Sequence, residues 1–234
     1  YTDSKDHLDF NYYGGNVKKR VLIGIVIVLC VVLGIIFLPR EIEEIVGSSE
    51  KISEAQIYQV KDDEVALVYN YSLQKAKAVY KDGVVYIPLN WTRSILNDKF
   101  YYSDDEKLLS YALPTEIVYA NFENKDKNGK PLLLEKDNKT YISIETVKTY
   151  TDIWTDVFTD GDIKKIYIND NFGEYEEGNV KSKSVLRVDA SMLSASIENV
   201  ELEKDSKVTV VEQKGKWDKV LTESGVMGYI KRKH

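Results

Sequence analysis

KDGVVYIPL, residues 81–89, returns in altered form as NKTYISI, residues 138–144. Tyr86 of the first stretch matches Tyr141 of the second, at a spacing of 55 residues. Both stretches have the β-branched and aromatic residues that favour a strand, and each is followed by a segment that we expect to be helical. A polar turn and a second apolar run come next in both copies. The pattern therefore predicts a repeated unit of strand, helix and strand.

The two repeated units cover residues 80–112 and 137–168, and chance similarity between two strand–helix pairs is the alternative explanation. If the repeat is real, equivalent apolar positions should be buried together, as in Leu89 with Ile144. Strand signals separated by Gly, Asn and Asp continue on both sides of the units. We therefore expect an α+β domain over residues 63–175, built from two strand-helix-strand repeats.

Shorter strands joined by tight polar turns fill the last segment, residues 180–234. This arrangement indicates a small all-β barrel. Trp217 and Tyr229 are its most prominent aromatic residues. Their rings have two alternative roles: they stack on a wall sugar or peptide, or they fill the core, since aromatic side chains dominate small cores. We select Trp217 and Tyr229 as the candidate ligand-binding residues.

An unbroken apolar run, VLIGIVIVLCVVLGIIFL, precedes both domains at Val21–Leu38. At about 1.5 Å per residue, a helix of this length spans about 27 Å, close to the hydrocarbon thickness of a bilayer. Three basic residues precede the run, so the positive-inside rule places residues 1–20 in the cytoplasm. A cleavable signal peptide, a lipoprotein signal and a buried core helix are the alternatives. We expect a single-pass transmembrane helix in the cell membrane, a juxtamembrane linker over residues 39–62 and extracellular domains beyond it.

The composition argues against several classes of function. Negative charge concentrates in residues 41–179, whereas nucleic-acid binding needs a basic face. The two histidines, His7 and His234, lie near opposite ends of the sequence, so a catalytic triad or an imidazole metal site lacks its central residue. The single cysteine, Cys30, lies inside the apolar run. We therefore expect no enzyme activity, catalytic residue, metal or cofactor in this chain, and no nucleic-acid partner.

The repeated cassette, YIPLNWTRSILNDKFYYSDDEKLLSYALPTEIV with its second copy, resembles the stalk domain related to the N-terminal domain of copper amine oxidases, over residues 62–172. The C-terminal order LEKDSKVTVVE…GKWDKVLTESGVMGYI resembles bacterial SH3-like domains, which often bind cell-wall peptides. Those domains often carry an Asn-Val-Arg-x-Gly-Pro-like stretch at the first strand and loop, where this chain has RVDAS at residues 187–191. That difference falls in the region of the family's ligand groove.

An anchor, a duplicated stalk domain and an SH3-like barrel together resemble the N-terminal, non-catalytic region of membrane-anchored glycoside hydrolase family 18 proteins of Gram-positive, clostridia-like bacteria. In those proteins a catalytic barrel follows the SH3-like domain. The resemblance implies an extracellular cell-wall binding or positioning module, with peptidoglycan or its peptides as partner and the lipid bilayer held through Val21–Leu38. A signalling or assembly ectodomain that binds a protein partner is the alternative function.

Overall fold

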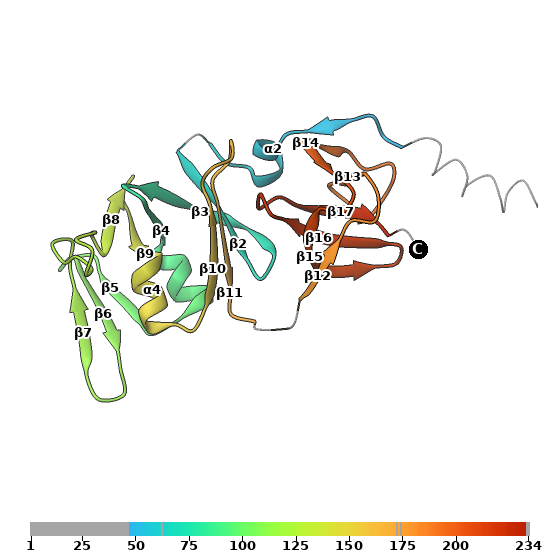
Figure 1. The fold of residues 1–234 in the computed structure, drawn as a ribbon. Coiled ribbons are helices and arrows are strands. Elements are labelled where there is room, and N and C mark those ends of the chain that lie inside the picture. The colour runs from blue at the N-terminus through green and yellow to red at the C-terminus, as the bar shows by residue number, and fades with distance from the viewer. Residues whose placement is uncertain (1–46, 62, 172, 174, 233–234) are drawn as a thin grey trace, which may run out of the picture. The chain divides into compact units, whose positions relative to one another are not determined.

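Three β-sheets and a few short helices make up most of the described chain (Figure 1). The computed structural model describes residues 47–61, 63–171, 173 and 175–232. From Ser49 onward the described residues form one compact unit. Within these ranges, no helix has both the length and the apolar character needed to cross a bilayer. The predicted cytoplasmic head and the predicted membrane helix at Val21–Leu38 lie outside the described residues.

Residues 63–171 form one lobe, which we call the sheet B lobe because sheet B is its centre. Sheet B has the strand order β10-β11-β2-β3-β4-β9-β8, in which β11 and β2 run parallel and the other neighbours run antiparallel. Its strands are β2 (Glu64–Tyr69), β3 (Ser72–Lys81), β4 (Val84–Pro88), β8 (Leu133–Lys136), β9 (Lys139–Ser143), β10 (Trp154–Phe158) and β11 (Lys165–Asn169). Three of its hairpins turn at two residues with positive φ, which suits tight two-residue loops: Asn70 with Tyr71, Asp82 with Gly83, and Asp137 with Asn138.

Sheet B is buried on both faces at its centre. Leu67 and Ile166 belong to a large core that also holds residues of the helices and of a smaller sheet, sheet C. Val68 and Tyr167, the next residues along the same strands, belong to a second cluster that includes residues of sheet A. Because side chains alternate between the faces of a strand, sheet B lies between two apolar layers.

The two segments compared in the sequence have a similar order of elements, which is a strand, helical turns and then two strands. The first unit runs through β4, α3 (Leu89–Trp91), η1 (Thr92–Leu96), β5 (Phe100–Ser103) and β6 (Leu108–Ala112). The second unit runs through β9, α4 (Ile144–Tyr150), β10 and β11. β4 and β9 pair with each other in antiparallel orientation. The equivalent residues Tyr86 and Tyr141 are both buried, and so are Leu89 and Ile144.

The two units differ in their helices and in the sheet that each hairpin joins. Ser143 caps α4, because its side chain accepts a hydrogen bond from the backbone nitrogen of Thr146 at 3.2 Å. Pro88 holds the equivalent position in the first unit and offers no side-chain cap, and there only three residues of α3 precede the wider turns of η1. The hairpin β10–β11 joins sheet B, whereas β5 and β6 form sheet C with β7 (Ile117–Ala120).

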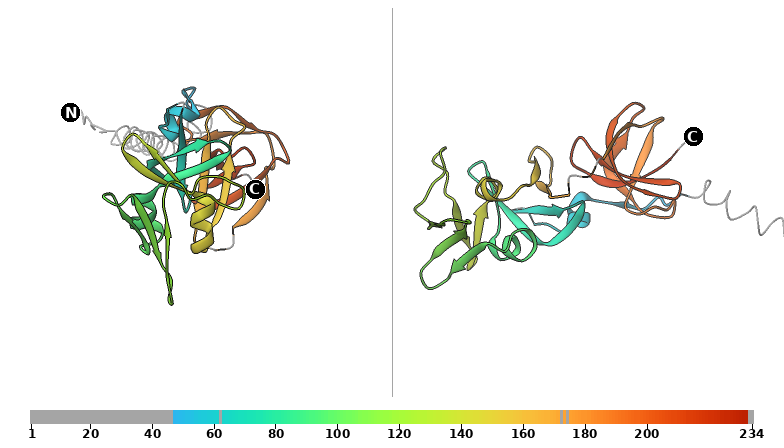
Figure 2. Two further views of the ribbon diagram at one scale, coloured as in Figure 1. Left: turned by 90° about the vertical axis from the view of Figure 1, so that its left-hand side faces the viewer. Right: turned by 90° about the horizontal axis from the view of Figure 1, so that it is seen from below.

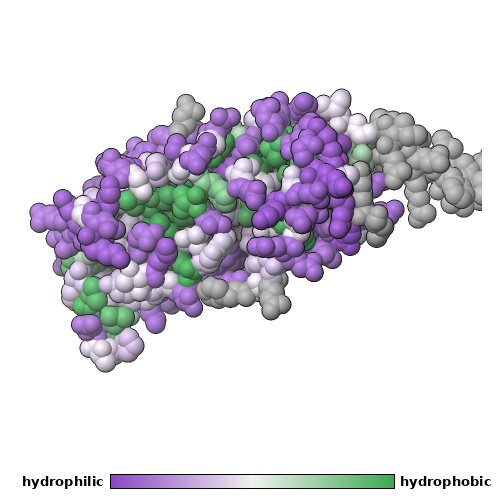
Figure 3. Space-filling view, viewed as in Figure 1, coloured by the Kyte–Doolittle hydropathy of each residue, from purple (hydrophilic) through white to green (hydrophobic). Residues whose placement is uncertain are grey.

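Sheet C has one exposed face with aromatic residues. Tyr101 of β5 lies opposite Ser110 of β6, which lies opposite Tyr119 of β7. The two tyrosines are 56% and 58% exposed, and Ile117 on the same face is 54% exposed. Figure 3 shows hydrophobic surface at this end of the sheet B lobe, at the lower left.

Residues 175–232 form the second lobe, the sheet A lobe. Sheet A has the strand order β1-β14-β13-β17-β16-β15-β12 and curves around its own apolar core, helped by register shifts in two strand pairs (Figure 2). Its strands from this lobe are β12 (Glu176–Asn179), β13 (Ser184–Arg187), β14 (Ser196–Leu202), β15 (Lys207–Lys214), β16 (Trp217–Thr222) and β17 (Met227–Lys231). β17 passes close to β13, since a Cβ on Gly228 would lie 2.7 Å from the carbonyl oxygen of Arg187. Only glycine fits this crossing.

Residues 51–58 of the predicted linker are part of the fold. β1 (Lys51–Ile52) pairs in parallel with β14 of sheet A. α2 (Glu54–Tyr58) begins at a capping box, in which the side chains of Ser53 and Gln56 bind each other's backbone N–H groups. Tyr58 at its end is only 1% exposed. Residues 51–58 differ from the predicted linker because this capped turn carries a large aromatic side chain, that of Tyr58, into the interior.

Candidate functional site

The predicted ligand-binding residues lie on neighbouring strands of sheet A. Trp217 is the first residue of β16 and lies opposite Lys231 of β17, while Tyr229 lies opposite Lys219. Trp217 and Tyr229 are therefore diagonal neighbours on one face of this strand pair. Side chains of the other face, Val220 among them, fill the core of the sheet A lobe. Both aromatic residues stand on the outer face, where they are half-buried.

The same outer face continues into the contact between the two lobes. Leu221 of β16 and Met227 of β17 pack in one apolar cluster with Tyr167 of the sheet B lobe. Lys219, also on this face, donates from Nζ to the carbonyl oxygen of Tyr71 at 3.2 Å. Trp217 lies at the other end of β16 from Leu221, whereas Tyr229 lies directly opposite Lys219, between Trp217 and the contact with the sheet B lobe.

Charged groups surround the candidate pair. Burial first, and then the nearby carboxylates of Glu212 and Asp189, raises the pKa of the Tyr229 hydroxyl. The hydroxyl therefore stays protonated at neutral pH and can donate a hydrogen bond to a ligand. Arg232 binds both carboxylate oxygens of Asp218 through Nε, at 3.1 and 3.2 Å, which ties the end of β17 to β16.

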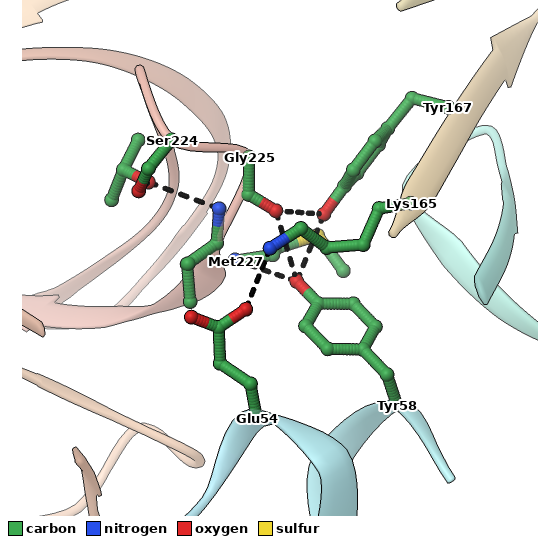
Figure 4. A network of polar contacts seen from close by, with 9 residues as sticks. Glu54, Tyr58, Lys165, Tyr167, Ser224, Gly225 and Met227 are labelled. Carbon is green, nitrogen blue, oxygen red and sulfur yellow. Dashed lines mark hydrogen bonds and ion pairs between the residues drawn. The ribbon is translucent and has the colours of Figure 1, made fainter. Parts of the chain in front are cut away.

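A second polar site lies between the lobes (Figure 4). Tyr58 of α2 and Tyr167 of β11 place their hydroxyl oxygens 3.0 Å apart, and both reach the carbonyl oxygen of Gly225, at 3.2 and 3.0 Å. The backbone nitrogen of Met227 donates to the Tyr58 hydroxyl at 3.0 Å. Each hydroxyl has one hydrogen, so Tyr167 can donate to Gly225 while Tyr58 donates to either oxygen. Burial raises the pKa of Tyr58 to about 12 and raises the pKa of Tyr167 as well, so both hydroxyls keep their hydrogens.

A buried ion pair stands beside this network (Figure 4). Lys165 of β11 is 1% exposed, and its Nζ lies 2.6 Å from Oε2 of Glu54 on α2. The ammonium group also lies 5.4 Å from the centre of the Tyr58 ring, within the range of a cation–π contact. The buried charge of Lys165 needs the opposite charge of Glu54, because an uncompensated charge is strongly unfavourable in a protein interior.

Gly225 marks a close approach of the two lobes. Its φ is +73°, and a Cβ at this position would lie 2.5 Å from Cδ2 of Phe158 on β10. Phe158 in turn packs edge-to-face against Tyr167, with ring centres 5.7 Å apart. The turn between β16 and β17 therefore fits against the sheet B lobe only with glycine at this position.

A cavity of about 570 Å³ opens between β10 and strands β12, β15 and β16. Three of its lining residues are carboxylates, Asp156, Glu177 and Glu223, and Lys207 lines it as well. Burial raises the pKa of Asp156. The predicted aromatic pair lies outside this cavity, so the structure does not bring the two features together.

The residues between the lobes are the ones that sequence reasoning missed. The Ser53-x-x-Gln56 pattern is a detectable signal for α2, because it is the signature of a capping box. Nothing in the local pattern distinguishes Lys165 from an exposed lysine, since its partner Glu54 is 111 residues away. Burial of this lysine could only be known from the tertiary structure.

The sites described above offer binding chemistry: aromatic rings, a neutral phenol, ammonium groups and carboxylates. In the part of the chain that the structure describes, no group of three or more His, Cys, Asp or Glu side chains is placed to hold a metal ion. Comparison with known proteins adds no relative, since no family model matches the chain and no curated protein or solved structure is significantly similar to it.

Proposed function

We propose that this chain is a membrane-anchored, extracellular module that binds cell-wall peptidoglycan or its peptides through the outer face of β16 and β17. The observation that carries the proposal is the placement of Trp217 and Tyr229 side by side on this face, outside the core. Aromatic rings suit the C–H faces of sugars and the flat surfaces of peptides, and they dominate binding hot spots.

The proposal includes a finer description of the two lobes. The sheet B lobe is an α+β stalk domain of two strand-helix-strand repeats, supported by the shared order of elements and by the buried equivalent residues. The sheet A lobe is a small SH3-like barrel, supported by its curved sheet, its own core and the glycine crossing of β17 over β13. The chain is then the non-catalytic region of a membrane-anchored glycoside hydrolase family 18 protein, held in the cell membrane of a Gram-positive bacterium by Val21–Leu38.

Retention on insoluble peptidoglycan tests the proposed site. The full chain in detergent should be retained, and Trp217→Ala and Tyr229→Ala should each weaken binding by about 1–3 kcal/mol, the range for an aromatic contact at a hot spot. Because both residues stand on the outer face, the melting temperature should change little. Tyr119→Ala on sheet C is the matched control, since it removes an exposed tyrosine from the other lobe.

Two outcomes would contradict the proposal. A stable Tyr229→Ala variant with unchanged retention would remove Tyr229 from the site. Failure of the unmodified chain to bind peptidoglycan would reject wall binding altogether and leave the protein-partner function.

A protein partner is the second candidate function, and the exposed face of sheet C favours it. Tyr101 and Tyr119 flank Ser110 on this face, with Ile117 beside them. Exposed apolar patches of this kind often mark sites of protein–protein interaction. Tyr119→Ala separates the two candidates, because it should leave wall retention unchanged and reduce capture of a protein partner.

A further inference from the structure

Residues 50–58 belong to both lobes, and we call this segment the strap. At its start the strap is a strand of sheet A: the backbone nitrogen of Ser196 donates to the carbonyl oxygen of Glu50 at 2.9 Å, and Lys51 lies opposite Ser196. Its second part is α2, which lies between the lobes (Figure 4). The strap is therefore a short connection that both lobes share.

Hydrogen bonds from α2 reach both lobes. On the sheet B side, Glu54 pairs with Lys165 of β11 at 2.6 Å, and Lys77 of β3 donates to the carbonyl oxygen of Tyr58 at 2.8 Å. On the sheet A side, the Tyr58 hydroxyl accepts a hydrogen bond from the backbone nitrogen of Met227 at 3.0 Å. Tyr58 is thus a residue through which the strap holds the two lobes together.

The strap has fewer backbone hydrogen bonds than the strands it joins. β1 has two residues and one neighbouring strand, and α2 has five residues, too few for a helix that is stable by itself. β2, which follows the strap, is hydrogen-bonded on both sides, to β11 and to β3. Local opening begins where few bonds and contacts hold a segment. The strap can therefore detach while the other strands of both sheets stay paired.

We propose that the strap is a releasable latch: residues 50–58 detach as one unit, and the junction at Tyr58 then opens while each lobe stays folded. A pull on the chain from its N-terminal side acts first on β1 and next on α2, so tension favours release. The proposed function supplies a source of tension, because a membrane anchor before the strap and a wall ligand on sheet A would load the chain between them. Only this source of tension rests on the proposed function.

The closed junction is the resting state. After release, the hydrogen bonds from the Tyr167 hydroxyl to the Gly225 carbonyl and from Lys219 to the Tyr71 carbonyl still join the lobes. Release also exposes apolar side chains of the shared cluster, Leu221 among them, which is unfavourable in water. The latch therefore closes again when the tension ends.

Two backbone amides distinguish release of the strap from unfolding of sheet A. The Met227 amide donates to the Tyr58 hydroxyl of the strap. The Thr222 amide donates to the carbonyl oxygen of Val226, within the sheet A lobe, at 3.0 Å. Hydrogen exchange resolved to single amides in the full chain can therefore follow the two events separately.

Glu54→Gln is the test variant, because Glu54 touches neither amide. It leaves buried Lys165 without its counter-charge, so we expect exchange at Met227 to rise about tenfold or more while exchange at Thr222 stays within about twofold. Glu198→Gln, at an exposed position on β14, is the matched control and should change neither rate. Adding Lys165→Met to Glu54→Gln removes the unpaired charge and should bring exchange at Met227 back toward the unmodified rate.

Two results would overturn the latch. Equal acceleration at Met227 and Thr222 would show that the strap does not detach apart from sheet A. Unchanged exchange at Met227 in Glu54→Gln would show that Glu54 and Tyr58 do not detach as a unit. The measurement involves no wall ligand, so its failure leaves the proposed function standing, and loss of peptidoglycan retention leaves the latch standing.

Discussion

Tyr58, Tyr167 and Gly225 come from three distant parts of the sequence and meet at one point between the lobes. None of them has a chemical signature in the sequence, because tyrosine and glycine are ordinary residues of a strand-rich chain. Trp217 and Tyr229 lie on strands, as their pattern predicts, but the choice between core and surface depends on the register of β16 with β17. The strand register and the contacts between the lobes are properties of the tertiary structure. Residue patterns alone therefore do not decide whether Trp217 and Tyr229 lie in the core or on the surface.

Alkaline pH should weaken the junction. Burial raises the pKa of Tyr58 from 10.0 to about 12, and it raises the pKa of Tyr167 too. A group whose pKa is raised by folding contributes its stability below the unfolded pKa, and that contribution is lost as the pH rises toward the folded pKa. We therefore expect the free energy of unfolding to fall as the pH rises from about 10 to 12, with both tyrosines contributing to the fall.

Urea unfolding followed by circular dichroism at several alkaline pH values checks this expectation. Tyr58→Phe removes one of the two titrating hydroxyls, so its stability should fall less steeply with pH. The same slope in both proteins would contradict a role for Tyr58.

Gly225→Ala should destabilise the fold by about 2–4 kcal/mol, since it combines a strained positive φ with a clash against Phe158. Gly215→Ala is the matched control: its φ is +59°, and nothing lies within 4 Å of the added Cβ. The control should lose only about 1–2 kcal/mol, from backbone strain alone. Equal losses in the two variants, measured by urea unfolding, would show that the contact with Phe158 contributes nothing.

Among the secondary-structure elements, the strand and the helix that follows it could be predicted in both segments, because the two segments share a residue pattern. The sheet that each hairpin joins could not be predicted from the sequence. β5 and β6 pair with β7, the next strand along the chain, whereas β11 pairs with β2, which lies far upstream. The helices differ for a local reason, since Ser143 caps α4 and Pro88 offers no side-chain cap to α3. Local chemistry thus accounts for the helices, and long-range pairing for the sheets.

Ser143→Ala should lower the free energy of unfolding by about 1–2 kcal/mol, because it leaves the buried backbone nitrogen of Thr146 without its acceptor. Ser94→Ala, at an exposed position in η1, should change stability by less than about 0.5 kcal/mol. Thermal and urea unfolding of both variants measure the difference. A negligible loss in Ser143→Ala would mean that the cap does not stabilise α4.

The predicted ranges 63–175 and 180–234 separate the strands of sheet B from most strands of sheet A. Two strands of sheet A fall outside these ranges: β12 lies just before residue 180, and β1 of the strap lies before both ranges. Composition and strand spacing suggest where a domain lies, but they do not show that an upstream segment completes a downstream sheet. That pairing is set by the contact of β1 with β14, which no local pattern contains.

The orientation in the membrane is open to a direct test. We expect protease added to intact cells to digest the extracellular domains and to leave residues 1–20 protected, because positive charge before Val21–Leu38 favours a cytoplasmic N-terminus. A tag at the N-terminus, followed by immunoblotting, identifies the protected fragment, and lysed cells are the control. Domains that resist protease in intact cells but not in lysed cells would reverse the predicted orientation.

The pairing of β1 with β14 also fixes an order of events during synthesis. Lys51 leaves the ribosome long before Ser196, its partner in sheet A, has been made. The sheet B lobe can fold when β11 has emerged, but Tyr58 must wait for the strands that carry Gly225 and Met227. A nascent chain therefore presents its apolar junction surface to chaperones until translation reaches β17, because closure of that surface needs Gly225 and Met227.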